Sequence, residues 1–195
     1  GVGLANYLWL GVEHLVLGYD HILFVIGLVM LVSGWRRLVL VITGFTAAHS
    51  VTLGLSVLDV ISLPAAPVEA VIALSIIFVA TELLRLAHAR AAVTRRHPQI
   101  IALAFGLLHG FGFAGVLADI GLPRDTSFFA LALFNIGLEI GQLGVVGVCL
   151  GSAYLARRAA MPPAYAARVQ TGMVLVMGGL ASYWFVARTA QIIGF

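Results

Sequence analysis

Histidine and carboxylate side chains recur inside the long apolar stretches of this 195-residue sequence. Ionisable groups are costly in hydrocarbon, so those that occur there usually face one another or a water-filled cavity. Neutral imidazole suits zinc, copper, iron and nickel, and a carboxylate compensates the charge of a divalent ion. The pattern therefore predicts a site for a divalent transition metal such as nickel, cobalt, zinc, copper or iron. The candidate metal ligands are His14, Asp20, His21, His49, His109 and Glu139.

Depth in the membrane decides which of these side chains can meet. Three imidazoles and one carboxylate fall within about one or two helical turns of the middle of their apolar runs. These residues are His21, His49, His109 and Glu139. We expect them to converge, with water or substrate completing the coordination.

Further polar residues are expected around this centre. Asp20 is either a ligand or a hydrogen-bond partner that orients a histidine ring. Glu69 is expected nearer the outer surface, on the route to the site. Asn135 and Gln142 flank Glu139 and are expected to line the route or to support the ligands.

His14 and His21 lie seven residues apart on either side of Gly18. In a straight helix this spacing puts them on one face but separates them by about 10 Å. Two arrangements follow: either the histidines are two stations along a path, or the helix opens at Gly18 and both bind one metal.

The buried polar residues are also compatible with roles that need no metal. A buried histidine is often only a hydrogen-bonded packing residue, and imidazoles with carboxylates also form proton relays without metal. Glu82 is expected to form an ion pair with Arg85 three residues later at the membrane boundary, because side chains at this spacing are neighbours on a helix.

The elements that position these residues are predicted to be transmembrane helices. Hydrophobic residues make up 62% of the sequence and charged residues only 10%, which excludes an ordinary soluble domain. Apolar runs of about 20 residues span a bilayer, so we expect an all-α, polytopic bundle of about six helices in a single domain, residues 1–195. The expected spans are 6–32, 38–58, 67–86, 99–120, 128–154 and 169–187.

The basic residues indicate how the helices are oriented. All eleven are arginines, and they lie in short connections, which is typical of topology signals and not of a nucleic-acid-binding surface. Nine fall on one side of the expected membrane and only Arg124 and Arg188 on the other. The positive-inside rule makes the nine-arginine side cytoplasmic and both termini extracytoplasmic. The chain starts without a methionine, so we expect sequence upstream of Gly1.

The segment from His14 to His21 reads as histidine, five residues, then Asp-His. It resembles the signature of the HupE/UreJ family of membrane proteins, regarded as nickel or cobalt permeases associated with hydrogenase and urease maturation. Four further segments resemble the second branch of that family: 45–53, 68–75, 108–114 and 134–143. The resemblance implies a bacterial inner-membrane protein whose substrate is a metal ion.

These observations leave three functions open. The first is a divalent metal permease that passes the ion from the outer face, by Glu69 and His14, to the central ligands. The second is an intramembrane metal-dependent hydrolase or oxidase acting on a lipid or another membrane substrate, with Glu139 or Asp20 as the general base. The third is a sensor or accessory subunit that binds metal or protons without transporting them. Whether the protein forms a homo-oligomer is left open.

Overall fold

The computed structural model describes residues 4–87, 97–112 and 127–194, and every regular element within these ranges is an α-helix. The prediction of an all-helical bundle is confirmed. The helices are α1 (Leu4–Leu17), α2 (Tyr19–Leu31), α3 (Trp35–Val57), α4 (Ala65–Ala87), α6 (Pro98–Gly112), α8 (Ser127–Arg158) and α9 (Pro163–Ile192).

Four of these helices, α3, α4, α8 and α9, are long and apolar enough to cross a membrane, and the bent pair α1 and α2 makes a fifth candidate. Each corresponds to an expected span. Helix α6 has 15 residues, Pro98–Gly112, and covers the first part of the expected span 99–120. The rest of that span, including Asp119, lies outside the described residues, as do Arg124, His88 and three of the nine arginines.

The expected span 6–32 is not one continuous helix. It breaks at Gly18, and α1 and α2 meet there at an angle of 76°. The backbone dihedral angles of Gly18, φ −79° and ψ 87°, lie outside the α-helical range. The N–H of His21 donates to Oδ1 of Asp20 at 2.9 Å, so the Asp20 carboxylate satisfies a backbone donor at the start of α2. The local sequence Gly18-Tyr19-Asp20 thus ends one helix and begins the next.

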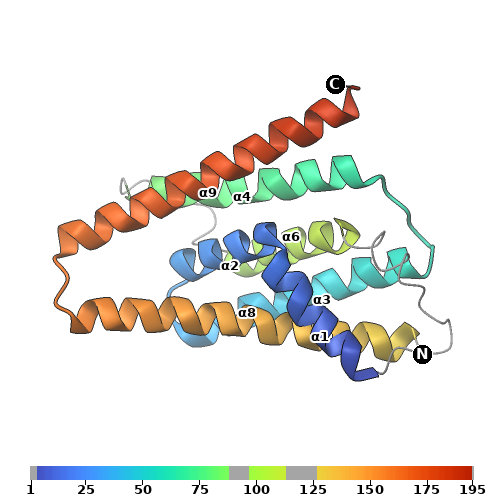
Figure 1. Ribbon diagram of the computed structural model, residues 1–195, viewed down its shortest axis with the longest axis horizontal. Helices are drawn as coiled ribbons and strands as arrows, with labels where there is room; N and C mark the ends of the chain where they lie inside the picture. Colours follow the sequence, from blue (N-terminus) through green and yellow to red (C-terminus); the bar gives the residue numbers. More distant parts are fainter. Residues whose placement is uncertain (1–3, 88–96, 113–126, 195) are drawn as a thin grey trace.

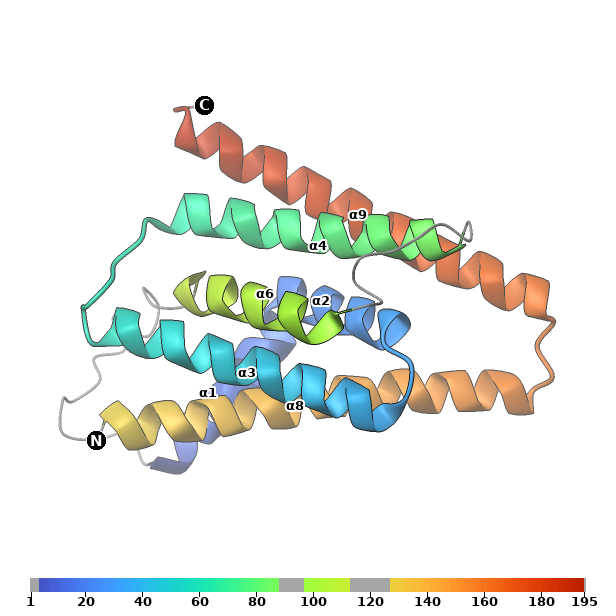
Figure 2. The same ribbon diagram turned by 180° about the vertical axis from the view of Figure 1, so that it is seen from behind.

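The helices lie in three tiers (Figures 1 and 2). Helices α4 and α9 form one tier, α2 and α6 lie in the middle, and α3 and α8 form the third. Helix α1 runs across α8 at the steep angle set by the bend (Figure 1). The most extensive contacts join α3 with α6, α1 with α8, and α4 with α9. The short helices α2 and α6 therefore lie between the α4–α9 tier and the α3–α8 tier (Figures 1 and 2).

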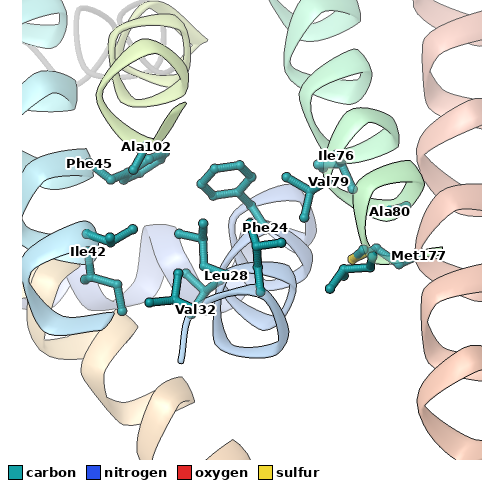
Figure 3. Close-up of a cluster of buried hydrophobic side chains, with 14 of the residues drawn as sticks. Phe24, Leu28, Val32, Ile42, Phe45, Ile76, Val79, Ala80, Ala102 and Met177 are labelled. Atoms are coloured by element: carbon teal, nitrogen blue, oxygen red, sulfur yellow. The ribbon is translucent and has the colours of Figure 1, made fainter. Parts of the chain in front are cut away.

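Phe24 of α2 is the centre of the buried apolar cluster. Figure 3 shows its ring between Ile76 and Val79 of α4 on one side and Phe45 of α3 and Ala102 of α6 on the other. The ring centroids of Phe24 and Phe45 are 5.1 Å apart, a normal spacing for packed aromatic rings. In a membrane, packing of this kind holds helices together because lipid removes most of the hydrophobic driving force.

The described arginines are distributed as expected from the sequence. Six lie near one end of the bundle, where α3 and α9 begin and α4 and α8 end (left in Figure 1). They are Arg36, Arg37, Arg85, Arg157, Arg158 and Arg168. Arg188 lies near the opposite end, close to the C-terminus of α9.

Large apolar side chains cover the outside of the bundle. Within the apolar window of α9 only 17% of residues are buried, and Val176, Tyr183 and Val186 are more than 60% exposed. A water-soluble protein rarely shows an apolar surface of this extent, whereas contact with lipid tails requires it. This surface and the long apolar helices define an integral membrane protein.

Candidate metal centre

His21 lies at the centre of the polar cluster inside the bundle. It belongs to two groups whose potential ligand atoms lie within 4.8 Å of one another: His14, His21 and His49 form one group, and Asp20, His21 and His109 form the other. Four helix segments contribute, namely α1, α2, α3 and α6. His21, His49 and His109 are almost completely buried, with exposed fractions of 4%, 0% and 0%.

The break at Gly18 decides the choice between the two arrangements left open for His14 and His21. Their ring centroids are 4.6 Å apart, against a separation of about 10 Å along a straight helix. The histidines therefore lie at one site and not at two separate stations. A Cβ atom built on Gly18 would lie 3.0 Å from Nδ1 of His21 and 2.7 Å from the carbonyl oxygen of His14. The bend has no room for a larger residue.

Close packing of α6 on α3 brings His109 to the same place. A Cβ atom on Gly106 would collide with the carbonyl oxygen of Phe45, and one on Gly110 with that of His49. Glycine at both positions lets the two backbones touch. The His109 ring consequently lies 5.0 Å from that of His21.

Asp20 orients the His21 ring. Oδ1 of Asp20 lies 3.1 Å from Nδ1 of His21. A carboxylate can only accept a hydrogen bond, so Nδ1 carries the proton and donates it. The second ring nitrogen, Nε2, then carries the lone pair.

Asn135 acts on His49 in the same way. The amide nitrogen of Asn135 donates to the Leu131 carbonyl at 2.8 Å, which turns its Oδ1 toward His49. Oδ1 lies 3.4 Å from Nδ1 of His49, a long contact. Because the oxygen is an acceptor, this contact favours the proton on Nδ1 and a lone pair on Nε2.

Ser75 of α4 acts on His109 through the opposite ring nitrogen. The Ser75 hydroxyl donates to the Ile72 carbonyl at 2.6 Å, so it uses its only proton there. Its oxygen lies 3.2 Å from Nε2 of His109 and can only accept from it. The proton is therefore on Nε2, and Nδ1 has the lone pair.

The three nitrogens left with lone pairs are Nε2 of His21, Nε2 of His49 and Nδ1 of His109. All three are buried, and no hydrogen-bond partner reaches them within the described part of the chain. A buried acceptor without a partner is costly unless something else binds it. Neutral imidazoles whose other nitrogen is held by a carboxylate, amide or hydroxyl are the usual ligands of first-row metals. The donor set thus fits a transition metal ion.

Glu139 and Gln142 lie along a polar seam between α3 and α8, and neither belongs to the two ligand groups. Thr43 donates to Glu139 at 2.6 Å, and Thr46 donates to Gln142 at 2.8 Å. Together with His49 and Asn135, these two pairs form what we call the α3–α8 seam. It extends along α3 for about 9 Å from His49 toward the arginine-rich end.

A cavity of about 310 Å³ opens on the other side of the cluster. Its lining includes His14, Asp20, His21 and His109 from the cluster, together with Glu69 and Arg188. Glu69 of α4 forms an ion pair with Arg188 of α9. Glu69 therefore lines the cavity, but it does not belong to either ligand group.

The expected ion pair between Glu82 and Arg85 is present, with Nη1 of Arg85 3.4 Å from Oε1 of Glu82. Ser75 and Arg188 were not among the predicted site residues. Ser75 is distant in sequence from His109, and Arg188 is distant from Glu69. A serine within a helix and an arginine near a helix end are also ordinary by composition. The sequence therefore contains no local signal that marks either residue.

The fold and the cluster define an α-helical integral membrane protein with a buried group of histidines and carboxylates. The chain belongs to the HupE/UreJ family, because the profile of that family, described as HupE / UreJ protein, matches residues 1–188. The resemblance noted from the sequence is confirmed. No curated protein and no solved structure matches the chain.

Proposed function

We propose that this protein is a permease for a divalent transition metal of the nickel or cobalt type. The observation that carries the proposal is the buried cluster around His21, which forms one potential ligand group with His14 and His49 and a second with Asp20 and His109. Nitrogen donors of this kind bind late first-row metals more tightly than magnesium or calcium, which prefer oxygen. Asp20 and His14 complete the ligand set.

Two features support transport over permanent binding. The cavity beside Glu69 leads to the ligands from one side, and the α3–α8 seam continues from His49 on the other. An ion that leaves the histidines would therefore meet Gln142 and then Glu139, both of which offer oxygen atoms. Glu139 serves in this proposal as an exit residue instead of a central ligand.

The distribution of the arginines gives the direction of metal transport in this proposal. Glu69 and Arg188, which line the cavity, lie near the ends of α4 and α9 opposite the six described arginines, and the positive-inside rule makes the arginine-rich end cytoplasmic. The metal is then taken up from outside and released to the cytoplasm.

Metal analysis of the purified protein tests the centre. We expect bound nickel or cobalt in the wild type and a large loss in His21→Ala, because His21 belongs to both ligand groups. His97→Ala is the control, since His97 is exposed and outside both groups. Equal metal content in the wild type and His21→Ala, or no metal in either, contradicts the metal centre.

Uptake into proteoliposomes separates the permease from the other two functions. The wild type should accumulate nickel(II) or cobalt(II) inside the vesicles, and His21→Ala should not. A protein that holds metal firmly but moves none across the bilayer is not a permease. That result favours the enzyme, in which the cavity would hold a membrane substrate beside the metal, or the sensor.

A further inference from the structure

Arg188 and Glu69 lie together on the cavity that leads to the histidines. An arginine beside a cation pathway needs an explanation, because its permanent charge repels a divalent ion. Its guanidinium is held from two directions: Nε contacts the Glu69 carboxylate, and Nη1 donates to Gln191 at 3.1 Å. These two contacts hold the guanidinium of Arg188 against the carboxylate of Glu69.

The pair is accessible and joins two helices, α4 and α9, that contribute none of the proposed ligands. The side chains of Glu69 and Arg188 are 35% and 42% exposed. Exposed ion pairs contribute little to stability. A divalent cation can therefore displace the arginine from the carboxylate at small cost.

The cavity is also large enough for a hydrated ion. Water occupies about 30 Å³ per molecule, so six waters need roughly 180 Å³, and the cavity has about 310 Å³. An arriving ion can keep its water shell beside Glu69 and lose it only at the buried nitrogens. Carboxylates bind hydrated divalent ions well, whereas imidazole ligands require partial dehydration.

We propose that Glu69 is an outer capture site for the hydrated metal ion and that Arg188 is its tethered counter-ion, which the metal displaces on arrival. This inference rests on the proposed permease function and adds a regulatory element to it. The ion pair keeps the cavity from accumulating monovalent cations, because only a cation of higher charge competes effectively with the bound guanidinium. Arg188 thus acts as a positioning and selectivity residue for Glu69, and it does not bind the metal.

The two single substitutions should have opposite effects on the rate of metal capture. Two carboxylates, Asp20 and Glu69, and one guanidinium line the cavity. Arg188→Gln removes the positive charge and exposes Glu69, so we expect association to become about 3- to 10-fold faster at low salt. Glu69→Gln leaves Arg188 alone, so association should slow by a similar factor. The double variant has the formal charge of the wild type but lacks the capture carboxylate, so it should bind faster than Glu69→Gln and no faster than the wild type.

Stopped-flow mixing of the full-length protein with cobalt(II) measures these rates. Trp184 lines the cavity, so a bound paramagnetic ion should quench its fluorescence. Trp9 and Trp35 are replaced by phenylalanine in all proteins; both are 65% exposed. Arg168→Gln, on the same helix but at the opposite end, is the control for net charge. Raising the salt concentration should reduce the differences between variants.

The outcomes separate this inference from the proposed function. If both single variants slow capture, or neither changes it, the ion pair only ties α4 to α9 and the inference is wrong. In that case saturable quenching that disappears in His21→Ala still supports the metal centre. If the quenching in the wild type does not depend on His21, the proposed metal permease itself is contradicted, whatever the effect of the ion pair.

Discussion

The rings of His14 and His21 meet edge to face with centroids 4.6 Å apart, although they are seven positions apart in the sequence. They come from two helices that meet at 76°, so the bend itself forms part of the site. A centre of this kind responds to backbone changes at Gly18 as strongly as to changes in its ligands.

Replacing Gly18 by alanine should weaken metal binding about 10- to 100-fold, the range typical of substitutions that misorient a ligand. The added Cβ would lie 3.0 Å from Nδ1 of His21 and 3.2 Å from Oδ1 of Asp20, so both side chains must move. Isothermal titration of cobalt(II) into the purified variant measures the affinity. Gly144→Ala in α8 is the control, because a Cβ there meets nothing within 4 Å; equal affinities in both variants would contradict the role of the bend.

Ser75→Ala should reduce metal affinity by about tenfold or more, although Ser75 is not a proposed ligand. Without its oxygen, Nε2 of His109 loses the acceptor that fixes the tautomer and the ring orientation. Ser182→Ala is a close control, since Ser182 also donates to a helix carbonyl, that of Gly178, but forms no hydrogen bond to a histidine among the described residues. The same titration compares them, and a wild-type affinity in Ser75→Ala would argue against the assigned tautomer.

Gly110→Ala should destabilise the fold by about 1–3 kcal/mol, the usual cost of overpacking. Its Cβ would overlap the His49 carbonyl oxygen and Oγ1 of Thr52, which forces α6 away from α3. Unfolding in detergent, followed by circular dichroism, measures the change. Gly54→Ala provides the comparison: it lies in α3 with open space around it, so it should leave the stability unchanged or raise it slightly.

Magnesium and calcium, even in large excess, should not displace cobalt(II) or nickel(II) from the centre. Four of the five proposed ligands are imidazoles, and hard cations prefer oxygen donors. Competition experiments with the Trp184 signal measure this preference. Zinc(II), which accepts imidazole well, should compete; displacement by magnesium instead would mean that the metal binds at the carboxylates.

The sequence by itself determined the membrane helices and most of the proposed ligand set. Spans such as 38–58 and 67–86 are visible because the length of an apolar run is a local property, and they match α3 and α4 closely. His21, His49 and His109 could be singled out because imidazoles inside such runs are costly without a function. Their similar depth in the membrane was predicted by counting residues from the ends of each apolar run.

Only the tertiary structure decided how these residues combine. The direction of the bend at Gly18 brings His14 to His21. The sequence was compatible both with two separate stations for these histidines and with one shared site. Asp20 lies beside the imidazoles, whereas Glu139 contacts Thr43, 96 positions away in the chain. The depth of a residue follows from its position along one helix, but the direction in which its side chain points depends on how that helix is rotated against its neighbours. That rotation is set by contacts between distant segments, such as Gly110 on the backbone of His49.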